Sequence, residues 1–239
     1  MSEAVQLFVP PRAWGIPNPS PFCVKVETWL RIAEVDYVPH VANPLKAPRG
    51  KVPWIEHEGR TIADSQAIVA YLSERFGDLD APLTPEQRHL SHLVRRTLEE
   101  ATYFVSYHDR WLVPANFAHV YPVFFAPYGI GGWIASKVVL RNVRRNLWGH
   151  GIARYTPEER IAAGLADIDA VSHVLGGRSV FFGDRPTTVD AVVFAFLTQL
   201  LWTPFDGPLQ RRAREDETLV RYAEGLRDRY WSEIPELRS

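Results

Sequence analysis

The 239-residue sequence predicts an α/β domain followed by an all-helical domain. Two observations lead to this prediction. In the first third, short runs of strand-forming residues alternate with segments of helical spacing, in the order βαβ and then ββα. From Pro85 onward, no segment before the short apolar pair Phe181-Phe182 has a convincing strand pattern. We therefore expect a first domain at 1–78, a linker at 79–84 and a helical domain at 85–239.

Composition and charge exclude several classes of protein. The chain has 27 Lys and Arg residues against 28 Asp and Glu residues, so no basic excess points to a nucleic-acid partner. A single cysteine, Cys23, cannot form an intramolecular disulfide or a cysteine-based metal cluster. We therefore expect no metal and a reducing, cytoplasmic location. The first residues lack the basic patch and apolar run of a signal peptide.

The stretch Pro19-Ser20-Pro21-Phe22-Cys23 joins a short strand at 5–9 to a helix. Ser20 followed by proline is typical of an N-cap residue and the first helical position. Apolar residues recur along the helix, with Lys25 and Glu27 between them. The free N–H groups at a helix N-terminus suit a thiolate, carboxylate or phosphate. The alternative is that Ser20 only caps the helix.

The rest of the first third reads as strands, a hairpin and a second helix. A proline within a strand pattern indicates an edge strand, which applies to Pro39. A glycine-containing turn between two strands predicts a hairpin. The sequence predicts strands at 37–41, 51–57 and 61–63, a hairpin turn at 58–60, and a helix at 66–76 capped by Asp64-Ser65 and ended by Gly77.

Three helices of the second part have clear signals. A long helix is expected over 87–112, where Tyr103, Tyr107 and Trp111 share a face because they are spaced four apart. The remaining two are 157–175, which Thr156 caps, and 189–201, which opens with a capping box formed by Thr187 and Asp190. We interpret Asp190 as a folding residue. The chain closes with an amphipathic helix at 217–230.

The segment 117–140 is the most apolar part of the chain. A membrane span needs about 20 uninterrupted apolar residues, and here Pro127, the glycines at 129–132 and Lys137 interrupt the run. We therefore expect no transmembrane span, but a turn followed by a buried or partner-facing helix. A basic stripe follows at helical spacing. It could be a solvated face, an anion-attracting lip or a membrane attachment, and consists of Lys137, Arg141, Arg144 and Arg145.

These motifs resemble those of the glutathione S-transferase superfamily, over nearly the whole chain. Ser20 to Cys23 lies on the position of the redox motif of glutaredoxins and omega-type transferases. Val52-Pro53 matches the family's cis-proline site, and 64–68 matches its acidic-Ser helix start. The segment 181–191 matches the signature of the second domain. Residues 14–23, 27–31 and 47–51 are similar to the metaxin and failed axon connections branch, which has many bacterial members.

The resemblance implies a thioredoxin-like first domain that binds glutathione as co-substrate. The Val52 backbone, beside cis-Pro53, would pair with the cysteinyl part of the tripeptide. Ser65 and the first N–H groups of its helix would bind the glutamyl carboxylate, and Asp64 the amine. Lys51 would meet the glycyl carboxylate. As alternatives, Lys51 is a solvated loop lysine, and Asp64-Ser65 is only a helix cap.

The resemblance also implies a hydrophobic substrate pocket bordered by the long helix. We expect a small hydrophobic electrophile there, lined by Trp14, Phe22, Tyr103, Tyr107 and Trp111. For each of these aromatic residues, simple core packing is the alternative.

The implied activity is that of a glutathione transferase in which Ser20 is catalytic and stabilises the thiolate. Because transferases of this fold commonly dimerise, a homodimer is also implied. Metaxin relatives act in protein import at membranes, so a non-catalytic binding module is a second hypothesis. A glutaredoxin-like oxidoreductase is a third, and it requires a reactive Cys23. That residue takes the position of the motif's second cysteine, and we expect it to be buried.

Overall fold

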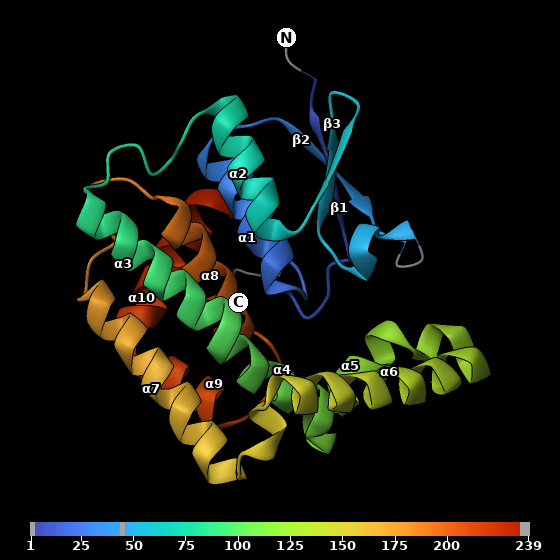
Figure 1. The fold of residues 1–239 in the computed structure, drawn as a ribbon. Coiled ribbons are helices and arrows are strands. Elements are labelled where there is room, and N and C mark those ends of the chain that lie inside the picture. Colours follow the sequence, from blue (N-terminus) through green and yellow to red (C-terminus); the bar gives the residue numbers. More distant parts are fainter. Residues whose placement is uncertain (1–2, 44–45, 235–239) are drawn as a thin grey trace.

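The computed structural model describes residues 3–43 and 46–234 and consists of a small α/β part beside a larger helical part (Figure 1). Four strands form one sheet in the order β2-β1-β3-β4. Strand β2 pairs parallel with β1, while β3 pairs antiparallel with both β1 and β4. The outer position of β2 confirms the edge strand expected from Pro39. The strands are β1 (Val5–Val9), β2 (Tyr37–Val41), β3 (Trp54–His57) and β4 (Arg60–Ala63).

Helices α1 (Pro21–Ile32) and α2 (Ser65–Phe76) pack beside this sheet. Residues Val5, Leu7 and Val9 alternate inward along β1 and form one core with apolar residues of both helices. On its other side α1 packs against α8 (Thr188–Leu201), so it has almost no solvated face. Lys25 and Glu27 are nevertheless both buried, Lys25 against α2 and η3 and Glu27 against Arg12 and Arg31.

The helical part confirms the fold class and most of the expected helices. Its first helix is continuous but contains a π-helical segment, since α3 (Pro85–Arg96), η3 (Thr97–Thr102) and α4 (Tyr103–Leu112) follow without a break. Helix α2 ends at Phe76 and α3 begins at Pro85, while the exact domain limits remain a prediction. The other helices are α7 (Pro157–Leu175), α8, α9 (Pro208–Glu215) and α10 (Glu217–Tyr230), of which α9 was not foreseen.

Asp190 has the structural role expected for it. Its carboxylate accepts hydrogen bonds from the N–H of Thr187 at 2.7 Å and of Phe181 at 2.8 Å, and from the Tyr222 hydroxyl at 2.8 Å. The side chain is fully buried, and burial raises the pKa of this carboxyl. Asp190 therefore joins the start of α8 to α10.

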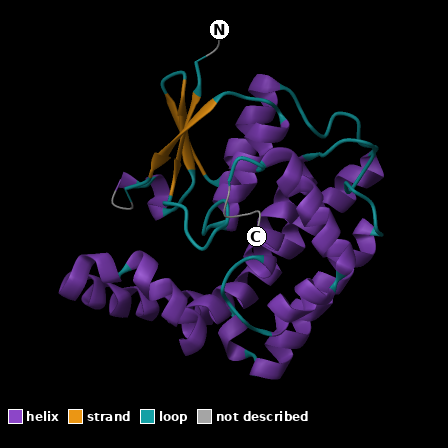
Figure 2. Ribbon diagram, turned by 180° about the vertical axis from the view of Figure 1, so that it is seen from behind, coloured by secondary structure: helices purple, strands orange, loops and turns teal. Residues whose placement is uncertain are grey.

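A pair of helices extends from the helical part as an arm, visible in both views (Figures 1 and 2). It consists of α5 (Pro114–Phe124), the short turn η4 (Ala126–Tyr128) and α6 (Gly129–His150), followed by η5 (Ile152–Arg154). We call residues 114–150 the arm. No single helix among the described residues is long and apolar enough to cross a membrane. Taken together, α5 and the segment η4–α6 have sufficient length and apolar composition, but their axes are bent by 52° relative to each other.

Candidate active site

Three parts of the chain meet at the edge of the sheet that is formed by the end of β1, the start of β3 and the end of β4. In the strand register, Phe8 of β1 lies opposite Trp54 of β3, which in turn lies opposite Ala63 of β4. Just beyond this row, β1 continues into the loop that leads to α1, the segment Val52-Pro53 leads into β3, and β4 continues into α2. The two helix N-termini and the proline loop are therefore brought together, as the sequence motifs require.

Ser20 occupies the N-cap position of α1, with extended backbone angles (φ −102°, ψ 121°). Its hydroxyl does not cap the helix, contrary to the simple capping role, and it interacts with the thiol of Cys23 enough to oppose the rise in that thiol's pKa. The N–H of Phe22 has no hydrogen-bond partner in the described part of the chain. The start of α1 thus offers a half-buried hydroxyl and a free N–H group, both of which can donate to an anion.

Cys23 is fully buried, as expected, and no other cysteine exists in the chain. Burial raises the pKa of its thiol well above the ordinary value, and the hydrogen bond from Ser20 opposes this shift only in part. A neutral, inaccessible thiol is a poor nucleophile. The structure therefore favours a packing role for Cys23.

The peptide bond between Val52 and Pro53 is cis, which confirms the expectation for this site. Val52 precedes β3, which begins at Trp54, and its backbone N–H and C=O form no hydrogen bond with any described residue. Unpaired backbone groups at the end of a strand can pair with an extended peptide. Lys51, the preceding residue, is exposed.

Asp64 caps α2, as expected for the start of this helix. Its Oδ1 accepts from the N–H groups of Gln66 at 2.9 Å and Ala67 at 3.3 Å. Its Oδ2 has no hydrogen-bond partner within the described ranges. Asp64 also has a positive φ of 85°, and strained backbone of this kind clusters at ligand sites. Capping and ligand binding are thus compatible at Asp64.

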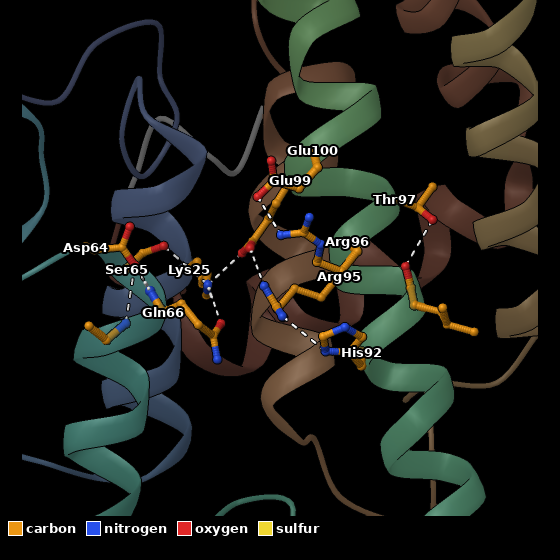
Figure 3. Close-up of polar contacts among 12 residues, drawn as sticks. Lys25, Asp64, Ser65, Gln66, His92, Arg95, Arg96, Thr97, Glu99 and Glu100 are labelled. Carbon is orange, nitrogen blue, oxygen red and sulfur yellow. Dashed lines mark hydrogen bonds and ion pairs between the residues drawn. The ribbon is translucent and has the colours of Figure 1, made fainter. Parts of the chain in front are cut away.

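Ser65 points inward, to a buried lysine that the sequence analysis did not single out (Figure 3). The Lys25 ammonium donates to Ser65 Oγ at 3.3 Å, to Gln66 Oε1 at 3.1 Å and to Glu99 Oε1 at 2.6 Å. Burial lowers the pKa of Lys25, and Glu99 opposes this change. Ser65 therefore has its hydroxyl engaged, and it keeps its backbone N–H for a ligand.

The Lys25 network joins three helices from both parts of the chain. Glu99 of η3 also pairs with Arg95 at 2.9 Å, and Arg95 contacts the His92 ring at 3.2 Å (Figure 3). Lys25 is fully buried and Glu99 is 6% exposed, so the pair is shielded from water. The network fixes the start of α2 against α1 and η3.

The expected aromatic residues form a continuous wall beside the start of α1. The ring of Phe22 meets Tyr103 edge-to-face at 4.9 Å, Tyr103 stacks on Tyr107 at 5.4 Å, and Tyr107 meets Trp111 at 6.1 Å. Burial raises the pKa of Tyr103 to about 12, so its phenol stays neutral. Trp14 lies apart from this row, because its indole N–H donates to the His119 carbonyl at 3.2 Å.

Arg110 connects Trp14 to the wall and was missed in the sequence. Its guanidinium donates to the Pro19 carbonyl at 2.7 Å and to Gln199 Oε1 at 2.7 Å, and it lies 5.6 Å from the centre of a Trp14 ring. No carboxylate of the described residues pairs with it. Burial lowers its pKa to about 10. The sequence signal that could have identified Arg110 is its position one turn after Tyr107 on the same helix.

Two surface hollows lie elsewhere on the molecule. One of about 190 Å³ lies between α2, α3 and α8 and includes Gln66, Ser91 and Arg95. The other, about 280 Å³, lies beside Phe76 and Tyr230. Neither is lined by Ser20 or Val52, so the edge described above is separate from both.

Comparison with known families agrees with this geometry. Residues 21–116 match the glutathione S-transferase N-terminal domain, and residues 164–226 match the glutathione S-transferase C-terminal domain. The chain belongs to the glutathione S-transferase superfamily. Glutathione is the co-substrate of this superfamily, which agrees with a site built from a helix N-terminus and a cis-proline loop.

Relatives of this glutathione S-transferase family member include the metaxin and failed axon connections branch expected from its motifs. It is 33% identical over 199 residues to Failed axon connections of Drosophila melanogaster, covering 77% of this chain and 47% of that protein, about half its length. It is 29% identical to isoprene-epoxide glutathione S-transferase of Rhodococcus sp. (strain AD45), covering 91% of this chain and 95% of that protein. It is 25% identical to human Metaxin-1, covering 100% of this chain and 54% of that protein.

Solved structures show the same fold at low identity. A glutathione S-transferase of Ceriporiopsis subvermispora in complex with glutathione superposes with a TM-score of 0.63 at 16% identity, covering 95% of this chain and 100% of that one. Poplar glutathione transferase F1 gives 0.61 at 14% identity, covering 99% of each chain. The thioredoxin-like first domain and helical second domain are thereby confirmed, while the roles of individual site residues stay predictions.

Proposed function

We propose that this chain is a glutathione transferase that holds the glutathione thiolate at the N-terminus of α1. The observation that carries this proposal is the row Phe8, Trp54 and Ala63, which brings Ser20, the unpaired Val52 backbone and the start of α2 to one edge. Each of these groups alone has a simpler structural explanation. Together they offer complementary sites for a thiol, a peptide and an amino acid terminus.

The tripeptide would lie along this edge in an extended form. Its cysteinyl backbone pairs with the N–H and C=O of Val52. Its glutamyl carboxylate accepts a hydrogen bond from the backbone N–H of Ser65, because Ser65 Oγ already accepts one from Lys25. Its amine meets Oδ2 of Asp64, and its glycyl carboxylate meets the exposed Lys51.

The thiol would lie at the start of α1, close to Ser20. The Ser20 hydroxyl turns from Cys23 to the sulfur of glutathione, and the N–H of Phe22 donates as well. Donors and the positive end of a helix favour the thiolate over the thiol and so lower the pKa of the bound thiol. The thiolate then attacks the electrophile held against the aromatic wall.

Arg110 supports an electrophile that becomes negatively charged at oxygen, such as a small epoxide. In that reaction the sulfur–carbon bond forms, a carbon–oxygen bond of the ring breaks, and the alkoxide takes a proton from water. A buried guanidinium without a carboxylate partner is suited to stabilise the alkoxide. The isoprene-epoxide glutathione S-transferase among the relatives supports the same substrate class.

The test combines calorimetry with glutathione and a conjugation assay with a nitrophenyl epoxide. Ser20→Ala should reduce turnover by roughly 10-fold to 100-fold with little change in glutathione affinity, because the lost donor acts mainly on the sulfur. Ser73→Ala, on α2, is the matched control. Equal losses in turnover and affinity, or no loss, would remove Ser20 from this role.

A second candidate is a non-catalytic glutathione-transferase-like binding module. One observation favours it: the Ser65 hydroxyl is tied to Lys25 rather than available to a ligand. The likeness to Failed axon connections and Metaxin-1 is compatible with this alternative. Absence of glutathione binding at millimolar concentration would favour the module. Thiol oxidoreductase activity is opposed by the burial of Cys23, and rapid thiol labelling of the native protein would reinstate it.

Two coarser expectations accompany the proposal. We place the protein in the cytoplasm, since its lone buried thiol suits a reducing compartment. We also expect a homodimer, as is common for transferases of this fold. Fractionation and sedimentation velocity test these two statements.

A further inference from the structure

The arm exposes an unusual number of large apolar side chains. On α6, Ile130 is 81% exposed and Trp133 is 55% exposed, and other apolar residues near them are similarly accessible. The buried positions of α6 face α4 and the turn η4, on the other side of the helix. The exposed apolar residues of the arm are Tyr128, Ile130, Trp133, Ile134, Val138 and Trp148.

The basic stripe lies on this same face. At 100° per residue, the exposed apolar and basic positions from 130 to 148 fall within an arc of roughly 140°. Most of the apolar residues lie toward the tip of the arm and the cations toward the body of the molecule, while Trp148 lies beyond the cations. The cations are Lys137, Arg141, Arg144 and Arg145.

The arm and its flanks contain no acidic residue. Between Asp109 and Glu158 the sequence has no Asp or Glu, although the whole chain has 28. Nothing in this region therefore neutralises the four exposed cations. The face is both apolar and strongly positive, and it belongs to an arm that extends sideways from the helical part (Figures 1 and 2).

We propose that the arm docks on a membrane surface that carries anionic lipids. The apolar tip enters the boundary between headgroups and acyl chains, and the cations contact lipid phosphates and carboxylates. The cations at 137–145 keep the rest of α6 out of the hydrocarbon, so the arm lies at the surface and does not span it. A two-fold contact between copies through this face would bring like charges together, which favours the lipid surface as occupant.

The experiment is flotation of the full chain with phosphatidylcholine vesicles and with vesicles of roughly one-third phosphatidylserine. We expect binding to the anionic vesicles, little binding to the neutral ones, and release at about 1 M salt, where charges are screened beyond a few ångströms. Replacing two arginines, Arg141→Gln with Arg145→Gln, should lower the partition coefficient on the order of 10-fold or more. Replacing Ile130→Ser with Trp133→Ser should lower it on both kinds of vesicle.

Matched controls use residues that are equally exposed elsewhere. Val41→Ser with Leu93→Ser removes two exposed apolar side chains, and Arg60→Gln with Arg221→Gln removes two exposed cations. Both control pairs should bind as wild type does. All replaced side chains are at the surface, and circular dichroism verifies that each variant is folded.

Two results would overturn the inference. The first is absence of flotation with anionic vesicles, or arm variants that float as well as wild type. The second is a dimer in sedimentation velocity that the arm variants alone convert to monomers, because a second copy would then cover the face. Glutathione binding is unaffected in either case, so this inference stands or falls independently of the proposed transferase.

Discussion

Replacing the buried lysine, Lys25→Met, should strongly destabilise the protein. The ammonium has no solvent exposure and makes hydrogen bonds to three side chains, of which the Glu99 contact is 2.6 Å long. Removing one partner of a buried ion pair costs about 3–5 kcal/mol. Glu99 would still pair with Arg95 at 2.9 Å, so we expect the lower end, about 3 kcal/mol.

Urea unfolding measures this loss, and an exposed ion pair supplies the control. The pair formed by Arg75 and Glu58 has the same 2.6 Å separation, but its side chains are 45% and 42% exposed. Because solvent screens it, Arg75→Met should cost far less unfolding free energy than Lys25→Met.

The refuting result is a Lys25→Met variant that is no less stable than Arg75→Met. In that case the buried pair would not hold α1, α2 and η3 together, and the position of Ser65 would need another explanation.

Three further predictions test other parts of the fold. Burial raises the pKa of the Cys23 thiol, whereas an unfolded thiol ionises near ~8.5, so the unfolded state loses its proton first and stability falls as pH rises above that value. Relative to Cys23→Ala, wild type should lose about 1.4 kcal/mol more unfolding free energy at about pH 9.5, and parallel pH profiles would contradict this. In the arm, a Cβ on Gly132 would lie 1.8 Å from the carbonyl oxygen of Phe125, so Gly132→Ala should open the tip at a cost of about 1–3 kcal/mol. Hydrogen exchange should accelerate in α6 but not in α8, and unchanged exchange in α6 would be inconsistent with the close approach. Finally, Asp190→Asn replaces an acceptor with a donor facing N–H groups and the Tyr222 hydroxyl, and should cost about 2–3 kcal/mol in urea unfolding; a neutral effect would contradict its structural role.

Local signals predicted much of the fold because they act within a few residues. Pro39 placed β2 at an edge, Asp64 capped α2, and Thr156 and Asp190 opened their helices as expected. The cis bond before Pro53 followed from the family resemblance, not from the residue itself. Features with a short-range physical cause were therefore available from the sequence.

The features that were missed depend on distant segments. Lys25 is buried because Ser65 and Gln66 of α2 and Glu99 of η3, which are 40 to 74 residues later, surround its ammonium. Arg110 acquires its role only when Pro19 and Gln199 are brought beside it. For the helix within 117–140, which was expected to be buried or partner-facing, the exposed apolar side chains oppose only the buried alternative, since no periodicity tells which side of a helix has a neighbour.

The most direct test of the central claim is the ionisation of glutathione bound to the protein. Titration of the thiolate absorbance in the complex should give a thiol pKa below the ordinary value near ~8.5, and Ser20→Ala should raise it again. Failure to form a complex at millimolar glutathione, or a bound thiol with the pKa of the free tripeptide, would contradict the account.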